Sequence, residues 1–203
     1  MKTTYKLSKK NILIGLLLLV ILSLALSNTD ERKLIDKLND DEVLIDKFID
    51  FSTDGYERKI NLSKNKMESV IDTAMSYLGT PNKVGGTSKD SIDASGLVYV
   101  SINKNFDIKF PRIAQDMARY GNVIINPKKL KRGDLVFFFD TYDVDRIITS
   151  VGLYLGEGSF LNSSTKDGVS ESDINDPYYW KEKFFFGTRI FKWDIWKISY
   201  LYF

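Results

Sequence analysis

Apolar residues change their spacing along the chain, from a helical period in its middle to strand-like runs in its second half. Between Lys66 and Leu78 they recur every three or four residues, which predicts a helix. The apolar face of this helix comprises Val70, Ile71, Ala74, Met75 and Leu78. Gly79 and Pro81 should end it, since neither residue continues a helix readily. A second helix should begin after Asp93, a favoured N-cap residue, and a third is expected over residues 112–120.

Strand-like apolar runs follow from Asp134 onward. The predicted strands are Leu135–Phe139, Ile147–Leu155, Ser159–Leu161, Phe184–Phe191 and, further on, Trp193–Tyr202. Helices followed by consecutive strands predict an α+β domain in which helices pack on an antiparallel sheet. The aromatic residues after position 192 favour an added edge strand, with a ligand platform as the less favoured alternative.

The N-terminal segment has the features of an export signal. Residues Met1–Lys10 carry four lysines and no acidic residue, and the apolar run Ile12–Leu26 follows. This run is shorter than the roughly 20 residues that span a bilayer comfortably. We therefore expect residues 1–27 to be a signal peptide cleaved after Ser27, with an uncleaved membrane anchor as the competing interpretation. In both cases the protein is exported to the periplasm or the cell surface, and membrane contact is confined to this segment.

Residues 28–65 are predicted to form a charged helical region and linker before a domain over residues 66–203. Within this region, the apolar positions of Asp30–Phe51 suit one or two amphipathic helices, with Asn39-Asp40-Asp41 as the place for a break. The favoured interpretation is that these helices pack on the following domain. The alternative is a partner-binding helix or a spacer from the membrane.

Composition narrows the chemistry, because the 203 residues include no cysteine and no histidine. Disulfides, thiol chemistry and thiolate metal sites are excluded, and the commonest general base is missing. Without residues 1–27 the chain has 25 basic and 27 acidic residues, so no basic excess favours nucleic acid. Asp140, Asp143 and Asp145 lack the glycine and distal glutamate of a calcium loop, so we expect neither a metal nor a cofactor. Nothing in the pattern predicts an oligomeric state.

An ordered series of short motifs resembles the NlpC-type cell-wall peptidases, papain-like enzymes that cut peptides within peptidoglycan. That family has a Tyr-Leu-Gly-Thr-Pro-Tyr-x-Trp-Gly-Gly run, then Asp-Cys-Ser-Gly-Leu, with the cysteine as nucleophile. The matching segments here are Tyr77–Pro81, Gly85–Thr87, Asp93–Leu97, Phe110–Arg112, Leu130–Phe138, Ser150–Gly156 and Phe160–Ser164. The resemblance extends from about Lys66 to Phe191 and implies the papain-like fold, which has the same order of helices and strands.

The resemblance also assigns positions to the catalytic groups, and none of them holds the family's catalytic residue. The nucleophile falls at Ala94, the base at Ser150 and the group that orients the base at Asn162. The family's cleft-lining tyrosine and tryptophan fall at Asn82 and Val84. This pattern implies a retained scaffold without its catalytic machinery, that is, a pseudoenzyme.

Six positions are the candidate binding residues of the remaining groove: Asn82, Asp93, Ser95, Arg112, Ser150 and Asn162. Arg112 is expected to offer its forked charge to a peptide carboxylate. We expect this groove to bind a peptidoglycan stem peptide, or the protein's surface to bind an envelope partner protein, without cleavage.

Two alternatives come from other functional classes. One is residual hydrolase or transferase activity through Ser95 or Ser150, with Asp93 or Lys83 as the base; against it, Asp93 is more simply a helix cap and Ser95 a polar first-turn residue. The other is an envelope scaffold that acts through the helices of Asp30–Phe51.

Overall fold

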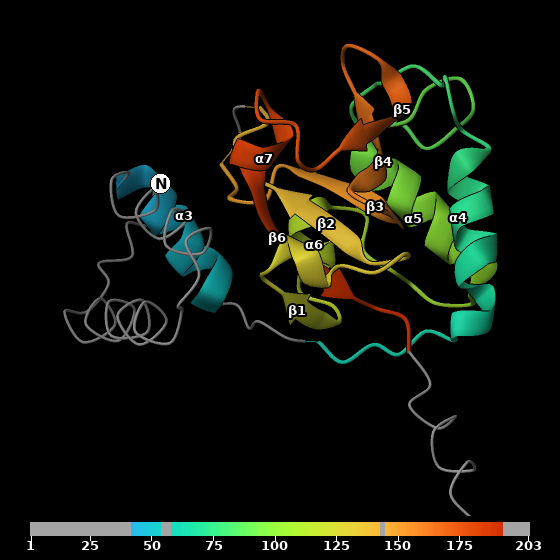
Figure 1. The fold of residues 1–203 in the computed structure, drawn as a ribbon, viewed down its shortest axis with the longest axis horizontal. Helices are drawn as coiled ribbons and strands as arrows, with labels where there is room; N and C mark the ends of the chain where they lie inside the picture. Colours follow the sequence, from blue (N-terminus) through green and yellow to red (C-terminus); the bar gives the residue numbers. More distant parts are fainter. Residues whose placement is uncertain (1–41, 54–57, 143–144, 193–203) are drawn as a thin grey trace, which may run out of the picture. The chain divides into compact units, whose positions relative to one another are not determined.

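A computed structural model describes residues 42–53, 58–142 and 145–192 of the chain (Figure 1). The chain divides into two compact units, Met1–Thr53 and Asp54–Phe203. The described part of the first unit is helix α3 (Glu42–Thr53), which confirms the second half of the amphipathic pattern. The expected signal or anchor, and the first half of that pattern, lie outside the described residues. Within the described ranges, no helix combines the length and the hydropathy that crossing a bilayer requires.

Helices come first in the second unit. The short helix η1 (Lys64–Lys66) leads into α4 (Met67–Met75), and α5 (Ala94–Asn105) follows the turn-rich stretch after it. The helix predicted after Asp93 is confirmed, and the one predicted from Lys66 is confirmed with an earlier end, because its last residues form turns. The unit also contains α6 (Ala114–Met117), η2 (Pro127–Lys129) and α7 (Trp180–Lys183).

The third predicted helix was too long, since only α6 forms within residues 112–120. Ile113, at its N-cap, has an extended backbone and makes no side-chain cap hydrogen bond. At the other end Tyr120 forms a β-bridge with Arg58, and the Gly121 N–H donates to the Arg58 carbonyl at 3.1 Å. This bridge takes the backbone out of the helix within one turn of its start.

Six antiparallel strands form one sheet in the order β1-β6-β2-β3-β4-β5, which confirms the α+β class. Their bounds are β1 Asn122–Ile124, β2 Leu135–Phe138, β3 Ser150–Gly156, β4 Ser159–Ser164, β5 Gly168–Asp173 and β6 Phe184–Arg189. Strands β1 and β5 were not predicted. Strand β3 begins at Ser150, three residues after its predicted start, because Gln115 Oε1 accepts the N–H groups of Ile147 and Ile148. The strand predicted over Trp193–Tyr202 lies outside the described residues.

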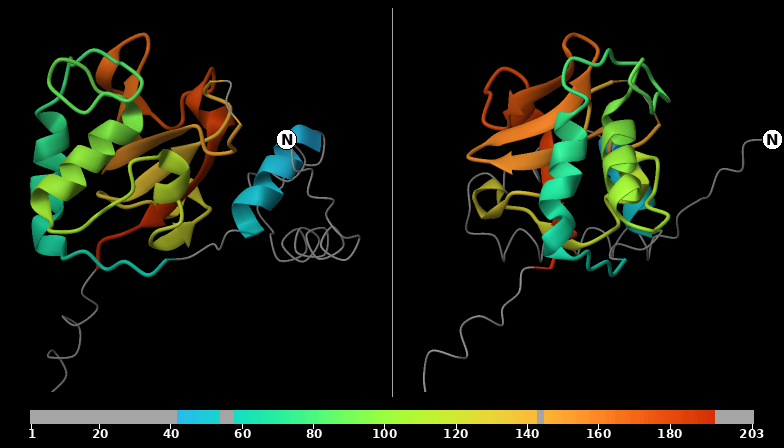
Figure 2. Two further views of the ribbon diagram at one scale, coloured as in Figure 1. Left: turned by 180° about the vertical axis from the view of Figure 1, so that it is seen from behind. Right: turned by 90° about the vertical axis from the view of Figure 1, so that its right-hand side faces the viewer.

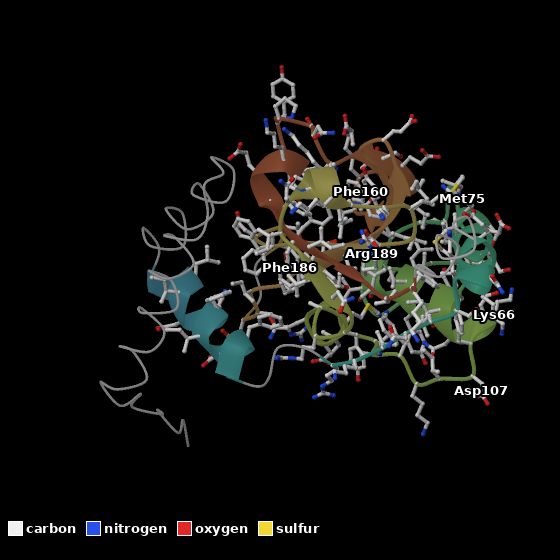
Figure 3. All side chains as sticks on the ribbon, turned by 60° about the horizontal axis from the view of Figure 1, so that its bottom comes forward. Lys66, Met75, Asp107, Phe160, Phe186 and Arg189 are labelled. Atoms are coloured by element: carbon white, nitrogen blue, oxygen red, sulfur yellow. The ribbon has the colours of Figure 1, made fainter. Side chains whose placement is uncertain are left out.

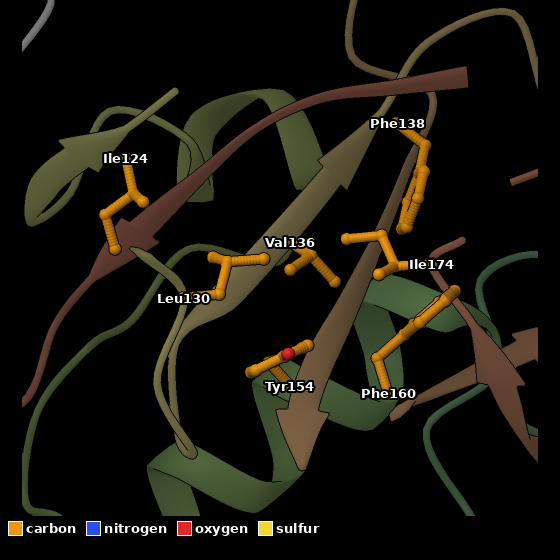
Figure 4. Packing of buried hydrophobic residues seen from close by; sticks show 7 residues of the cluster. All are labelled: Ile124, Leu130, Val136, Phe138, Tyr154, Phe160 and Ile174. Atoms are coloured by element: carbon orange, nitrogen blue, oxygen red, sulfur yellow. The ribbon is translucent and has the colours of Figure 1, made fainter. Parts of the chain in front are cut away.

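Both faces of the sheet are covered, so strand β2 is apolar at every position. Figure 2 shows α4 and α5 stacked on one side, where α5 contacts β3 and β4. The other face carries the apolar cluster drawn in Figure 4, which comprises Ile124, Leu130, Val136, Phe138, Tyr154, Phe160 and Ile174. Trp180 and Phe184 pack against this cluster from α7 and the start of β6. Helices on one face and an aromatic cover on the other give the sheet two apolar interfaces.

A loop segment runs along the outer edge of β5. The Gly79 N–H donates to the Val169 carbonyl at 2.9 Å, and the Val169 N–H donates to the Thr80 carbonyl at 2.9 Å. Gly168 has φ +63°, and a Cβ there would collide with the Thr80 backbone. The turn-rich stretch between α4 and α5 is therefore fastened to the sheet before it reaches Asp93.

A buried ion pair joins the start of β2 to the end of β6. Arg189 donates through Nε to Asp134 Oδ1 at 2.9 Å and through Nη2 to Oδ2 at 2.7 Å. The Asp134 residue is 1% exposed, and Figure 3 shows Arg189 within the body of the unit. The forked contact with Arg189 balances the charge of this carboxylate, and the Lys131 N–H also donates to its Oδ2 at 2.7 Å.

Candidate functional site

The candidate site is organised around the first turn of α5. Asp93 is its N-cap, with an extended backbone, and Asp93 Oδ1 accepts the Gly96 N–H at 2.6 Å. Ala94 is the first helical residue and is partly buried. Its side chain carries no group that could ionise or attack a carbonyl. The helix start thus places a methyl group where backbone N–H groups and the helix dipole would stabilise an anion.

Arg112 and Asp93 form a forked ion pair, which we call the Asp93–Arg112 clamp. Arg112 Nη1 lies 2.9 Å from Asp93 Oδ1, and Nη2 lies 2.8 Å from Oδ2. Nη2 also donates to the Gly86 carbonyl at 3.0 Å, and the Gly85 N–H donates to Asp93 Oδ2 at 2.5 Å. The clamp therefore ties the glycine loop to the helix start. The expected role of Arg112 toward a ligand carboxylate needs correction, since both of its terminal nitrogens are engaged within the chain.

The clamp also fixes the Ser95 hydroxyl. Ser95 Oγ donates to Asp93 Oδ1 at 3.1 Å and accepts from Arg112 Nη1 at 2.8 Å. A hydroxyl held between a carboxylate and a guanidinium is a structural member of the first turn. Its partner Asp93 is a weak base because its pKa is lowered.

The pKa of Asp93 is lowered from its ordinary value. Burial alone would raise this pKa, but hydrogen bonds from Arg112 and from the backbone of Gly96 and Gly85 outweigh it, with the Arg112 charge acting in the same direction. Asp93 is therefore ionised near neutral pH and paired, and a carboxylate stabilised in this form has little tendency to take a proton from serine.

Ser150 and Asn162 lie on neighbouring strands of the sheet. Ser150 is the first residue of β3, and Asn162 lies within β4, where its alternation places it on the face that carries Phe160. Asn162 Oδ1 is 3.5 Å from Ser172 Oγ, and its Nδ2 is buried with no hydrogen-bond partner among the described residues. With exposed fractions of 7% and 1%, the Ser150 and Asn162 residues are both buried.

Asn82 connects strand β4 to the loop that precedes α5. Its Nδ2 donates to the Ser163 carbonyl at 3.1 Å and to Ser163 Oγ at 2.9 Å. Ser163 Oγ in turn donates to the Ile92 carbonyl at 2.7 Å. The sequence did not identify Ser163 as part of the site, although it falls within a matched motif. Its role depends on a contact between segments about 70 residues apart, which no local pattern reveals.

The structure thus unites Asp93, Ser95 and Arg112 by direct contacts and links Asn82 to β4 beside Asn162. The candidate calcium residue Asp143 lies outside the described residues. Within the described ranges, no three or more acidic side chains are grouped closely enough to hold a metal ion. The remaining polar groups can donate or accept hydrogen bonds, and the serine–carboxylate contact among them is that of Ser95 with Asp93.

Comparison with known proteins agrees with this architecture. The model of the NlpC/P60 family matches residues 79–189. The chain is 34% identical over 119 residues to "Probable endopeptidase NlpC" of Escherichia coli, covering 59% of this chain and 75% of that protein. It is 30% identical over 121 residues to the E. coli "Murein DD-endopeptidase MepS/Murein LD-carboxypeptidase", covering 60% and 61% respectively.

A solved structure has the same fold. The lipoprotein-like NLP/P60 family protein of Staphylococcus aureus superposes with a TM-score of 0.57 at 28% identity. The match covers 65% of this chain and 43% of that protein, so this chain spans less than half of the S. aureus protein. Since the family model matches residues 79–189, more than half of the 203 residues, the chain belongs to the NlpC/P60 family.

Proposed function

We propose that this protein binds a cell-wall peptide without cleaving it, as a pseudoenzyme of its family. The observation that carries the proposal is Ala94 at the first position of α5, in a chain with no cysteine and no histidine. Peptide cleavage by this type of site needs a thiolate and an imidazole. The relatives named as endopeptidases, one of them a murein endopeptidase, support peptidoglycan as the source of the peptide.

The internal pairing of the clamp favours a ligand that carries no charge where it contacts the site. Arg112 and Asp93 neutralise each other, and Ala94, Ser150 and Asn162 are neutral residues. A terminal carboxylate would therefore find no free cation at the clamp. A peptide backbone, which carries no net charge, suits such a neutral site better.

Residual serine hydrolysis is the weaker alternative. Ser95 Oγ already donates to Asp93, whose lowered pKa makes it a poor proton acceptor. Losing one catalytic group costs several orders of magnitude in rate, and here both nucleophile and base are replaced. Turnover of stem peptides that disappears in Ser95→Ala or Ser150→Ala would establish this alternative.

We further propose that the protein is exported through residues 1–27, cleaved or retained as an anchor, with a linker over residues 28–65 and the family domain after it. The relatives include proteins named for murein and for lipoproteins, which supports a location outside the cytoplasm. Mass spectrometry of the protein from its native envelope would show whether residues 1–27 are present. An envelope pull-down with and without residues 30–51 would test a partner protein and the scaffold alternative.

Binding and cleavage are tested together on the full chain. Isothermal titration against purified muropeptides should give measurable affinity, while chromatography of digested sacculi should show no new products. The variant Ala94→Phe, which puts a ring at the start of α5, should lose binding. The matched control Ile108→Ala lies beyond the other end of α5, which is about 18 Å long, and should bind as the unmodified chain does. Absence of muropeptide affinity in the unmodified chain, or enzyme-like hydrolysis by it, would refute the proposal.

A further inference from the structure

Three tyrosines are exposed on two neighbouring segments of the second unit. The exposed fractions are 94% for Tyr178, 54% for Tyr142 and 37% for Tyr179. Tyr178 and Tyr179 directly precede α7, and Tyr142 lies in the connection between β2 and β3. We call these three residues the tyrosine rim. A group of large exposed rings on a folded domain marks a surface that binds something.

Direct contacts hold the two segments together. The Phe139 N–H donates to the Lys183 carbonyl at 3.0 Å, and Lys183 Nζ lies 2.9 Å from Asp140 Oδ2. Tyr179 Oη donates to the Thr141 carbonyl at 3.4 Å. Figure 1 accordingly shows α7 beside the connection that leaves β2. The two segments that carry the rim therefore lie side by side.

The base of the rim is rigid because it rests on the core. The Tyr179 ring meets Trp180 edge to face, with centroids 4.8 Å apart. Trp180 packs in turn on Phe138 at 4.7 Å and on Phe160 at 5.1 Å, both members of the apolar cluster. A ring fixed before binding loses little conformational entropy when a ligand covers it.

The rim adjoins the candidate site. The pKa of Tyr142 is raised, chiefly by burial and further by the negative charge of Asp93, while the charges of Arg146 and Arg112 act in the opposite direction. Geometry also places this segment beside the site, since the N–H of the neighbouring Thr141 donates to Thr149 Oγ1 at 3.0 Å and Thr149 directly precedes Ser150. A ligand in the site can therefore extend onto the rim.

The charges around the rim are balanced. Lys183 is paired with Asp140, and in α7 Lys181 is followed by Glu182. Asp145, Arg146 and Asp176 lie on the same two segments, so acidic and basic side chains are mixed there, which gives little attraction for a phosphate-rich polymer or an anionic membrane. A neutral ligand with an apolar face and hydroxyl groups fits flat phenol rings, which offer apolar area and a hydrogen-bonding tip. A sugar ring has this chemistry.

From these contacts, and resting on the proposed function, we propose that the tyrosine rim binds a neutral sugar ring of the glycan that carries the bound peptide. In peptidoglycan each stem peptide is joined to an N-acetylated sugar. A peptide seated at the clamp brings that sugar to the edge of the site, and the rim receives it. The protein consequently recognises peptide-bearing glycan in preference to free peptide.

The test compares three probes on the full chain: a disaccharide-linked muropeptide, the same stem peptide without sugar, and a peptide-free oligosaccharide of N-acetylglucosamine. The unmodified chain should bind the muropeptide about tenfold more tightly than the free peptide, which corresponds to one aromatic contact of moderate strength. Tyr178→Ala should remove this preference and the oligosaccharide binding, with the free-peptide affinity unchanged. Tyr178→Phe should keep most of both, and Ile108→Ala is the control away from the rim.

The outcomes separate the two proposals. Equal affinity for muropeptide and free peptide in the unmodified chain, together with no oligosaccharide binding, would overturn the rim and leave the peptide site standing. Sugar preference that persists in both Tyr178→Ala and Tyr142→Ala would also overturn it. Oligosaccharide binding that is lost in Tyr178→Ala, without any affinity for free peptide, would support the rim while the proposed peptide site fails. Because Tyr178 is 94% exposed, its substitution leaves the folded core intact.

Discussion

Replacing Arg112 by methionine should destabilise the second unit by about 2–4 kcal/mol, because it removes the centre of the clamp. The lost contacts are the two to the Asp93 carboxylate, at 2.9 and 2.8 Å, and those to Ser95 Oγ and the Gly86 carbonyl, at 2.8 and 3.0 Å. Breaking a buried ion pair by removing one partner costs about 3–5 kcal/mol. The side chains here are 29% and 18% exposed, which lowers the expected cost somewhat.

Urea unfolding followed by circular dichroism measures this change through the midpoint at constant m-value. The matched control is Arg132→Met, which breaks the ion pair with Glu68, whose side chains are 41% and 56% exposed. Exposed pairs contribute at most about 1 kcal/mol. The double variant Asp93→Asn/Arg112→Met should cost less than the sum of its single variants, since the two residues act through one contact. An Arg112→Met cost within about 0.5 kcal/mol of zero, or additive single costs, would refute the clamp as the organiser of the site.

Three further outcomes follow from the same contacts. Because the pKa of Asp93 is lowered in the fold, its contribution to stability is present above the ordinary aspartate pKa and is lost as pH falls through the folded value. Asp93→Asn should therefore reduce the dependence of the melting temperature on pH below about pH 4. An unchanged pH dependence in this range would contradict the argument. Arg189→Met should cost about 3–5 kcal/mol in urea unfolding, since Asp134 would stay buried without its guanidinium partner. A loss below about 1 kcal/mol would contradict the burial of that pair. Ala94→Cys should place a thiol at the helix N-terminus, and the pH dependence of its alkylation rate should give a thiol pKa below about 8.5. This variant should still not hydrolyse peptides, because the chain has no imidazole. An ordinary thiol pKa would show that the first turn no longer stabilises an anion.

The order of helices and strands could be predicted from the sequence, because buried apolar residues recur with one period in helices and another in strands. The helix after Asp93 was predicted from a capping side chain, and the structure has that bond to Gly96. Strands β1 and β5 were missed, since β5 reads Gly-Val-Ser-Glu-Ser-Asp and forms through pairing with β4 rather than through its own apolar alternation. The third helix was overpredicted because the bridge between Arg58 and Tyr120 is non-local.

The site was only partly predictable for a related reason. The order of the motifs located Asp93, Ser95 and Arg112. It predicted that Arg112 contacts a ligand, whereas in the structure Arg112 pairs with Asp93, 19 positions away. The partner of a long charged side chain depends on which loops meet in space, and the sequence carries no local sign of that. The tyrosine rim was likewise not predicted, since Tyr142 and Tyr179 come together only through the contacts of α7.

The fastening of Gly79 and Thr80 to Val169 has a consequence for the behaviour of the protein at high concentration. Those two bonds occupy the outward N–H and C=O of Val169, at the start of a strand whose edge would otherwise offer a template to other chains. The same stretch of loop continues toward the clamp, so we expect damage to the clamp to weaken the hold of the loop on the sheet margin. Variants that damage the clamp should accordingly self-associate into β-rich aggregates before they unfold completely, which ties the solubility of the protein to the integrity of the Asp93–Arg112 clamp.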